Sequence, residues 1–125
     1  NDEQWIFNMN NHINLWTGQE KKLWDGIRLI NIGGHFPGSS ILHVPFLSKE
    51  GTVFCGDTLA IAPNKKHIAV MYSYPNRIPL SLQEMNRIKN RLDKIPFDSL
   101  YGFYSDQNLS EDVKKILAAS LHQYI

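Results

Sequence analysis

The sequence contains one cysteine, Cys55, so no disulfide bond can form within the chain. The lack of a disulfide framework fits a reducing compartment, and we expect the protein to be cytoplasmic. An excess of one charge is also missing, because 13 Lys and Arg residues are balanced by 12 Asp and Glu residues. This balance gives no electrostatic basis for binding nucleic acid or an anionic membrane, and we expect neither as a partner.

Long apolar runs are absent as well. No stretch approaches the roughly 20 apolar residues that span a bilayer, and residues 1–11 have neither the basic nor the apolar region of a signal peptide. The sequence does not begin with Met, and we expect it to be a piece of a longer polypeptide. Hydrophobic residues make up 42% of it and charged residues 20%, which argues against disorder and favours one globular domain over residues 1–125.

The apolar pattern predicts a series of short strands. We expect them at residues 13–16, 27–32, 41–44, 52–55, 68–72 and 99–103. Asp25-Gly26 precedes the second of these strands and is typical of a two-residue hairpin turn. Short strands joined by turns favour antiparallel pairing, because parallel neighbours need long crossover connections.

Two helices are predicted from apolar residues at helical spacing. The first covers residues 80–92, with an apolar stripe at Leu82, Met85, Ile88 and Leu92. Ser81 and Glu84 have the spacing of a capping box at its start. The second covers residues 110–124, begins at a Ser110 cap, and turns its apolar side inward at Val113, Ile116, Leu117 and Leu121. Strands followed by helix, strand and helix predict an α/β (α+β layered) fold with a mixed, mostly antiparallel sheet.

His35 is the first candidate for chemistry. It lies in the run GGHFPG at residues 33–38, which must be a loop because three glycines and a proline disrupt regular elements. A histidine on a tight loop between two strands is held firmly, and neutral imidazole is a common metal ligand. For a single histidine, a turn in which the side chain has no role is the more frequent alternative.

Asp57 is the second candidate, in the run GDTL at residues 56–59, directly after the strand expected at residues 52–55. A carboxylate at the end of a buried strand can bind a metal ion or take part in catalysis. The competing interpretation is that Asp57 only caps the turn that follows. Cys55 belongs to the strand itself, and we expect it to be a small core residue.

The two runs, their order and the hairpin between them resemble the metallo-β-lactamase superfamily. In that family a GHTPG-like loop supplies a histidine ligand, and a GDTL-like strand end supplies an aspartate that bridges two metal ions. The resemblance covers residues from about 13 to the C-terminus and implies half of an αββα sandwich, the C-terminal part of the domain. It departs from the family at Phe36, where Thr is usual, and at Ser40, where a second His often stands.

Other ligands of that family are missing. No HxHxDH motif precedes the His35 loop, and the stretch expected to carry the last histidine, residues 97–105, has none; Phe103 or Tyr104 takes its place. Residues 71–80 and this aromatic stretch resemble an uncharacterised branch of the superfamily. The aromatics there, Tyr72, Tyr74, Phe103 and Tyr104, either pack in the core or shape a pocket. Asn76 and Arg77 either contact substrate or belong to a solvated loop, and His12, His43, His67 and His122 are not expected to be ligands.

Two functions follow from the resemblance. The first is a hydrolase that uses metal-activated water on an ester, thioester, amide or phosphodiester, with His35 as a ligand and Asp57 as both ligand and catalytic residue. The metal is expected to be Zn, with Fe or Mn as alternatives, and this chain alone is expected to bind it weakly or not at all and to be inactive. The second is a non-catalytic binding or scaffold module. The expected partners are an unidentified small-molecule substrate, the missing N-terminal half of the domain, and further copies of the chain through self-association.

Overall fold

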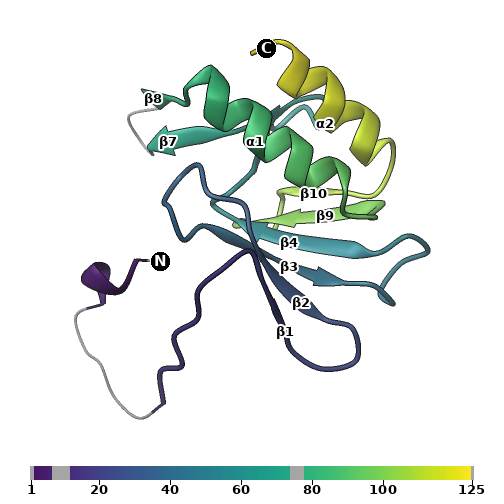
Figure 1. Ribbon diagram of the computed structural model, residues 1–125. Coiled ribbons are helices and arrows are strands. Elements are labelled where there is room, and N and C mark those ends of the chain that lie inside the picture. Colours follow the sequence, from purple (N-terminus) through teal and green to yellow (C-terminus); the bar gives the residue numbers. More distant parts are fainter. Residues whose placement is uncertain (1, 7–11, 74–77, 125) are drawn as a thin grey trace.

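The computed structural model describes residues 2–6, 12–73 and 78–124 of the chain, and its largest element is a six-stranded sheet (Figure 1). The strand order is β1-β2-β3-β4-β9-β10. These strands are β1 (Glu20–Lys22), β2 (Arg28–Asn31), β3 (Ser40–Val44), β4 (Thr52–Gly56), β9 (Ser99–Gly102) and β10 (Asn108–Leu109). All neighbours pair antiparallel except β4 and β9, which are parallel. The predicted α/β class with a mostly antiparallel mixed sheet is therefore confirmed.

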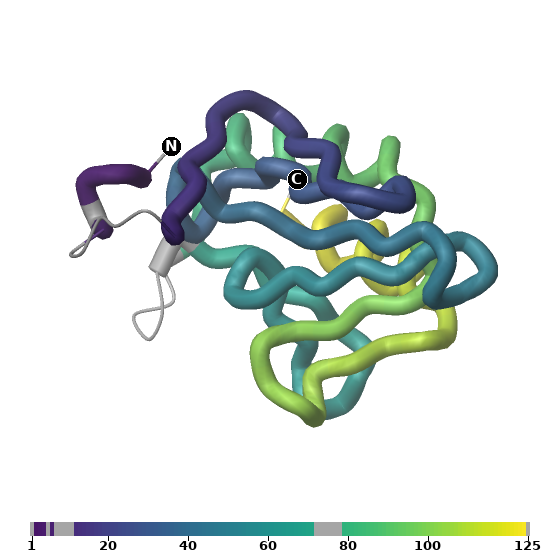
Figure 2. Tube along the Cα trace, turned by 90° about the horizontal axis from the view of Figure 1, so that it is seen from below, coloured from purple at the N-terminus to yellow at the C-terminus, as the bar shows by residue number. Residues whose placement is uncertain are grey.

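Both helices, α1 (Leu82–Asp93) and α2 (Val113–His122), lie over one face of this sheet. Among the described residues, none of the helices lies over the opposite face, as the view from below shows (Figure 2). Two small hairpins complete the described part of the fold, β5 (Ala60–Ile61) with β6 (Ile68–Ala69) and β7 (Met71–Ser73) with β8 (Ile78–Pro79). A short 3₁₀ helix, η1 (Glu3–Trp5), lies near the N-terminus. None of the described helices is long and apolar enough to cross a membrane.

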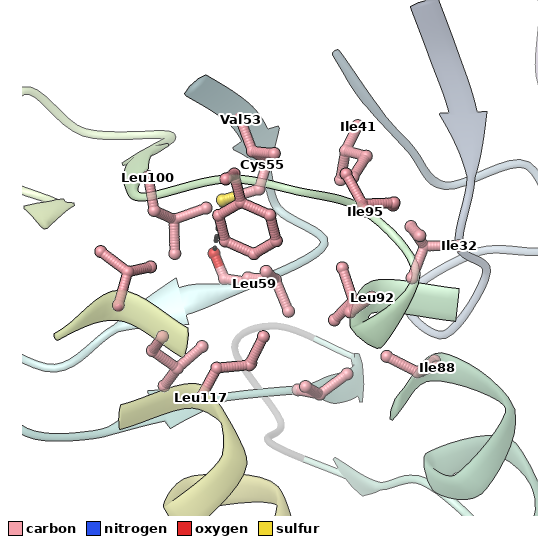
Figure 3. Close-up of a cluster of buried hydrophobic side chains, with 14 of the residues drawn as sticks. Ile32, Ile41, Val53, Cys55, Leu59, Ile88, Leu92, Ile95, Leu100 and Leu117 are labelled. Carbon is pink, nitrogen blue, oxygen red and sulfur yellow. Dashed lines mark hydrogen bonds between the residues drawn. The ribbon is translucent and has the colours of Figure 1, made fainter. Parts of the chain in front are cut away.

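The core lies between the helices and the inner face of the sheet (Figure 3). Val53 and Cys55 alternate with exposed Phe54 along β4, so one face of the strand is buried and the other is open. The two helices contribute Ile88, Leu92 and Leu117 to the same cluster. Cys55 is a core residue as predicted, with 1% of its surface exposed.

Helix α1 starts where the sequence predicts. The Glu84 backbone N–H donates to the Ser81 hydroxyl at 3.3 Å, and the Glu84 carboxylate accepts from the Ser81 backbone N–H at 3.3 Å. Of the predicted apolar stripe, Met85, Ile88 and Leu92 are buried, whereas 55% of Leu82 is exposed. At about 100° per residue, Leu82 points roughly 90° away from the centre of the buried stripe.

Helix α2 begins later than predicted. Its N-cap is Asp112, which has a left-handed backbone with a φ of 52° and makes no side-chain capping bond, so the predicted Ser110 cap is wrong. The reversal at Asp112 turns the chain into the helix only at Val113, which is buried. Leu117 and Leu121 are buried as expected, and Ile116 packs against the core while partly exposed.

Two predicted strands need correction. Residues 13–16 form no strand; the first strand is β1, whose three side chains are exposed and charged or polar. Such an edge strand is held by backbone pairing with β2, so it has no apolar pattern to reveal it. The strand expected at residues 68–72 is divided at Val70 between β6 and β7, which belong to different hairpins. The hairpin turn between β1 and β2 is confirmed, with positive φ at Asp25 and Gly26.

Candidate functional site

The candidate residues leave the sheet at one end. Because β3 is antiparallel to both β2 and β4, the latter two strands finish at the same end of the sheet. Strand β9 runs parallel to β4 and finishes there too. We call this the loop end of the sheet. It comprises residues 33–38 after β2, residues 57–59 after β4 and residues 103–106 after β9.

The His35 loop is closed at its base by backbone hydrogen bonds. The N–H groups of Ile32 and Gly33 donate to the Ser39 carbonyl at 2.9 and 3.0 Å. The Ser39 hydroxyl accepts from the Phe36 N–H at 2.8 Å. Left-handed backbone at Gly33 and Gly34 lets the chain turn this sharply. The His35 side chain is half-buried, and its ring meets the edge of Phe36 at a centroid distance of 4.7 Å. The loop backbone is therefore fixed, and it carries a half-buried imidazole at the loop end.

Asp57 lies on an exposed turn directly after β4. The turn is formed by left-handed Gly56 and by the Thr58 N–H, which donates to the Cys55 carbonyl at 2.9 Å. Asp57 lines a hollow of about 320 Å³ together with Phe103, Tyr104 and Gln107, among others. Asp57 thus lies beside the aromatic pair that stands where the family resemblance expects a final histidine.

Phe103 and Tyr104 are not core residues, which decides one alternative left open by the sequence. They are 61% and 63% exposed, and their rings meet edge to face at a centroid distance of 4.9 Å. Both line the Asp57 hollow, together with Gln107, which the sequence did not mark as a site residue. Tyr74, Asn76 and Arg77, and the side chain of Tyr72, lie outside the described residues.

His35 and Asp57 follow strands that are separated by β3 alone, so their backbones leave the sheet roughly 10 Å apart. That spacing is within reach of two side chains that extend toward each other. A shared metal site for the pair remains a prediction. Over the described ranges, no three or more His, Cys, Asp and Glu side chains gather into a group that could hold a metal ion.

The remaining histidines lie elsewhere. His43 is 2% exposed on the inner face of β3, with its Nε2 atom 2.7 Å from the Pro96 carbonyl oxygen. His67 lies 3.3 Å from the Tyr124 hydroxyl, and His122 is exposed at the last turn of α2. The thiol of Cys55 points into the core, where burial raises its pKa to about 12, so the thiolate that could act as nucleophile or ligand is disfavoured.

A second polar region, missed by the sequence analysis, lies between β2 and α1. Arg87 and Arg91 of α1 line a hollow there together with Asn31 of β2. Their spacing of four residues, which puts both on one side of the helix, was the available signal. The contacts with Asn31 join residues far apart in the chain and could not be predicted from local pattern.

Comparison with known proteins assigns the chain to no family of known function. No protein-family model and no solved structure matches the chain. It is similar to "Uncharacterized protein YmaE" of Bacillus subtilis (strain 168), with 31% identity over 118 residues. The match covers 91% of this chain and 43% of that protein, so the chain spans less than half the length of the relative.

Proposed function

We propose that the full-length protein is a metal-dependent hydrolase of the metallo-β-lactamase superfamily, with His35 and Asp57 as two of its metal ligands. The observation that supports this most is the common end of β2 and β4, which puts the loops bearing the two residues at one end of the sheet. Their motifs resemble the family's, and their order along the chain is the same. The structure of the described part is compatible with one half of an αββα sandwich, and the N-terminal half would then cover the open sheet face.

The two proposed ligands, His35 and Asp57, are of types that bind a divalent ion, but two ligands are too few for a catalytic site. Imidazole nitrogen and carboxylate oxygen are both good zinc ligands, but a catalytic zinc site uses three protein ligands and leaves a fourth position for water. The described residues offer no group of three. In the proposed centre, ligands from outside this chain would complete the coordination. Without the family's last histidine, we expect a mononuclear or otherwise altered site, and this chain alone should be inactive.

A divalent ion such as Zn²⁺ lowers the pKa of water toward 7 and so supplies a nucleophile at neutral pH. The residues of this chain would hold that ion and position the substrate. Exposed Phe103 and Tyr104 form an apolar wall next to Asp57, suited to an apolar part of the substrate. The substrate class stays as broad as the chemistry allows, an ester, thioester, amide or phosphodiester.

The second candidate is a binding module without catalysis. The same aromatic pair favours this candidate. Phe103 and Tyr104 provide contact area for a ligand beside Asp57, but their side chains have no imidazole nitrogen or carboxylate to bind a metal. In that case the hollow would recognise a ligand or protein partner by apolar contact. A fold of this kind does not fix the function, so the two candidates must be separated by experiment.

Metal analysis of the full-length protein separates them. Protein purified without added chelator should contain zinc, iron or manganese, and His35→Ala and Asp57→Ala should each lower the bound amount. His122→Ala and Glu50→Ala are matched controls, since both side chains are exposed and neither lies at the loop end. If the wild type cannot be loaded with any of the three metals, the binding module is the better description. If both variants keep their metal, the resemblance extends to the fold and not to the chemistry.

A further inference from the structure

A basic groove runs between β2 and α1, on the side of the His35 loop that faces the helix. We define it by Arg28, Arg87, Arg91 and Lys94, which line two adjoining hollows of about 610 and 170 Å³. Both hollows share Asn31 and Arg91, so they form one continuous depression. Glu20 and Glu84 also line it, which leaves an excess of positive charge.

Arg91 is fixed in the groove by a buried amide. Its Nη1 atom donates to the Asn31 backbone carbonyl at 2.9 Å and to the Asn31 side-chain oxygen at 3.0 Å. Asn31 is only 7% exposed, and its Nδ2 atom donates to the Pro37 carbonyl at 2.9 Å. Within the described part of the chain both hydrogen bonds of the guanidinium use Nη1, which leaves Nε and Nη2 for a ligand. The group is positioned before any ligand arrives, which lowers the entropic cost of binding.

Arg87 lies one helical turn before Arg91 on the same side of α1. Its Nη2 atom lies 2.9 Å from the position that a Cβ at Gly33 would occupy, so the guanidinium lies against the loop backbone at a point where glycine leaves room. The ion pairs of the described residues are Arg28 with Glu20 and Lys89 with Asp93, and neither involves Arg87. A planar donor group therefore lines the groove without a direct ion pair to a carboxylate of the described residues.

Both acidic residues of the groove already have hydrogen-bond partners. The Glu84 carboxylate accepts from the Ser81 hydroxyl at 2.9 Å and from the Ser81 backbone N–H at 3.3 Å, as part of the helix cap. Glu20 is paired with Arg28 at 3.0 Å. Burial, and to a smaller extent the positive charge of Arg87, lower the pKa of Arg91. Two like charges one turn apart destabilise a helix, and an anion bound between them would remove that repulsion.

We propose that the basic groove binds an oxyanion, the phosphate or carboxylate group of a small molecule, between the guanidinium groups of Arg87 and Arg91. The fork of N–H donors in a guanidinium matches two oxygens of a phosphate or carboxylate, which a lysine ammonium does not. Gly34 of the His35 loop also lines the larger hollow, and the missing side chain of Gly33 leaves the room in which the Arg87 guanidinium lies. This inference does not depend on a metal at the loop end.

The test is a titration of the isotopically labelled full-length protein with inorganic phosphate, followed by NMR in metal-free buffer at constant ionic strength. Saturable shifts are expected at the Gly33 and Gly34 amides and at the Nε–H groups of Arg87 and Arg91. Arg87→Gln should weaken phosphate binding about tenfold, or about 1.4 kcal/mol. Lys89→Gln is the matched control, because Lys89 lies on the same helix and lines neither hollow. Its affinity for phosphate should equal that of the wild type.

A parallel titration with malonate distinguishes the two ligand classes. Tighter binding of phosphate assigns a phosphorylated ligand, and tighter binding of malonate assigns a carboxylate. Shifts that grow linearly with either anion, or an equal loss of affinity in Arg87→Gln and Lys89→Gln, would show general attraction to positive charge and overturn the proposal. Because metal is absent throughout, failure here leaves the proposed hydrolase untouched, and the reverse also holds.

Discussion

Asp57 and Tyr104 line the same hollow because the strands before them, β4 and β9, are parallel neighbours that end together. In the proposed metal centre, Tyr104 or Phe103 stands where a further histidine ligand would be. Tyr104→His should therefore raise the zinc affinity of the full-length protein by about tenfold or more, equivalent to at least about 1.4 kcal/mol. Phe46→His is the control, as Phe46 is equally exposed but lies in the turn after β3, at the opposite end of the sheet. Competition titration with a zinc indicator measures both, and equal affinities would count against a metal beside Asp57.

The open sheet face predicts self-association of the 125-residue chain. Phe54 and Tyr101 are neighbours across β4 and β9, and their rings stack there at a centroid distance of 5.3 Å while 37% and 45% exposed. Exposed apolar surface of this kind favours pairing with another chain. Light scattering should report a mass that rises with concentration, and Phe54→Ser with Tyr101→Ser should shift it toward the monomer. Phe46→Ser, outside the sheet, should not. A monomer at every concentration would refute the prediction.

Removal of the Ser81 hydroxyl from the capping box of α1 should cause a modest loss of stability. Ser81→Ala removes the acceptor for the Glu84 N–H and should lower the free energy of unfolding by about 1 kcal/mol. Ser105→Ala, in the exposed loop after β9, should change it by less than about 0.5 kcal/mol. Chemical denaturation of both variants measures the difference. Equal stability of the two would mean that the cap contributes nothing.

The lowered pKa of Asp98 should make the stability of the protein depend on pH. The polar side chain of Ser48, and then the Glu50 backbone N–H at 3.3 Å, lower the pKa of this carboxyl below its ordinary 3.8. A depressed folded pKa stabilises the protein above the ordinary value, and this stabilisation is lost as the pH falls through the folded pKa. Asp98→Asn should therefore lower stability at neutral pH and flatten its decline below about pH 4. Thermal unfolding from pH 2 to 7 measures this, and parallel curves for wild type and variant would contradict it.

Sequence alone predicts those elements whose causes are local. The capping box and the buried stripe of α1 lie within one short segment. The predicted start of the helix, residue 80, is therefore within two residues of its observed start at Leu82. The parallel pairing of β4 with β9 joins distant segments and leaves no local pattern. Strand β1 was missed because backbone pairing holds it while its side chains remain in solvent.

The candidate site divides in the same way. His35 and Asp57 stand out because glycines mark the loop of one and a buried strand precedes the other. The hollow that joins Asp57 to Phe103 and Tyr104 depends on the register of β4 and β9, which only the fold supplies. The anchoring of Arg91 by Asn31 likewise needs the packing of α1 beside β2.

If His35 and Asp57 bind one metal ion, anomalous X-ray scattering from crystals of the full-length protein will locate that ion between them. Data collected on both sides of the absorption edge of the bound metal locate that metal and identify it. We predict a peak about 2.0–2.2 Å from a nitrogen of His35 and an oxygen of Asp57, with the remaining ligands from outside this chain. A metal bound with both side chains outside its coordination sphere, or a loop end without anomalous signal in metal-soaked crystals, would contradict the claim.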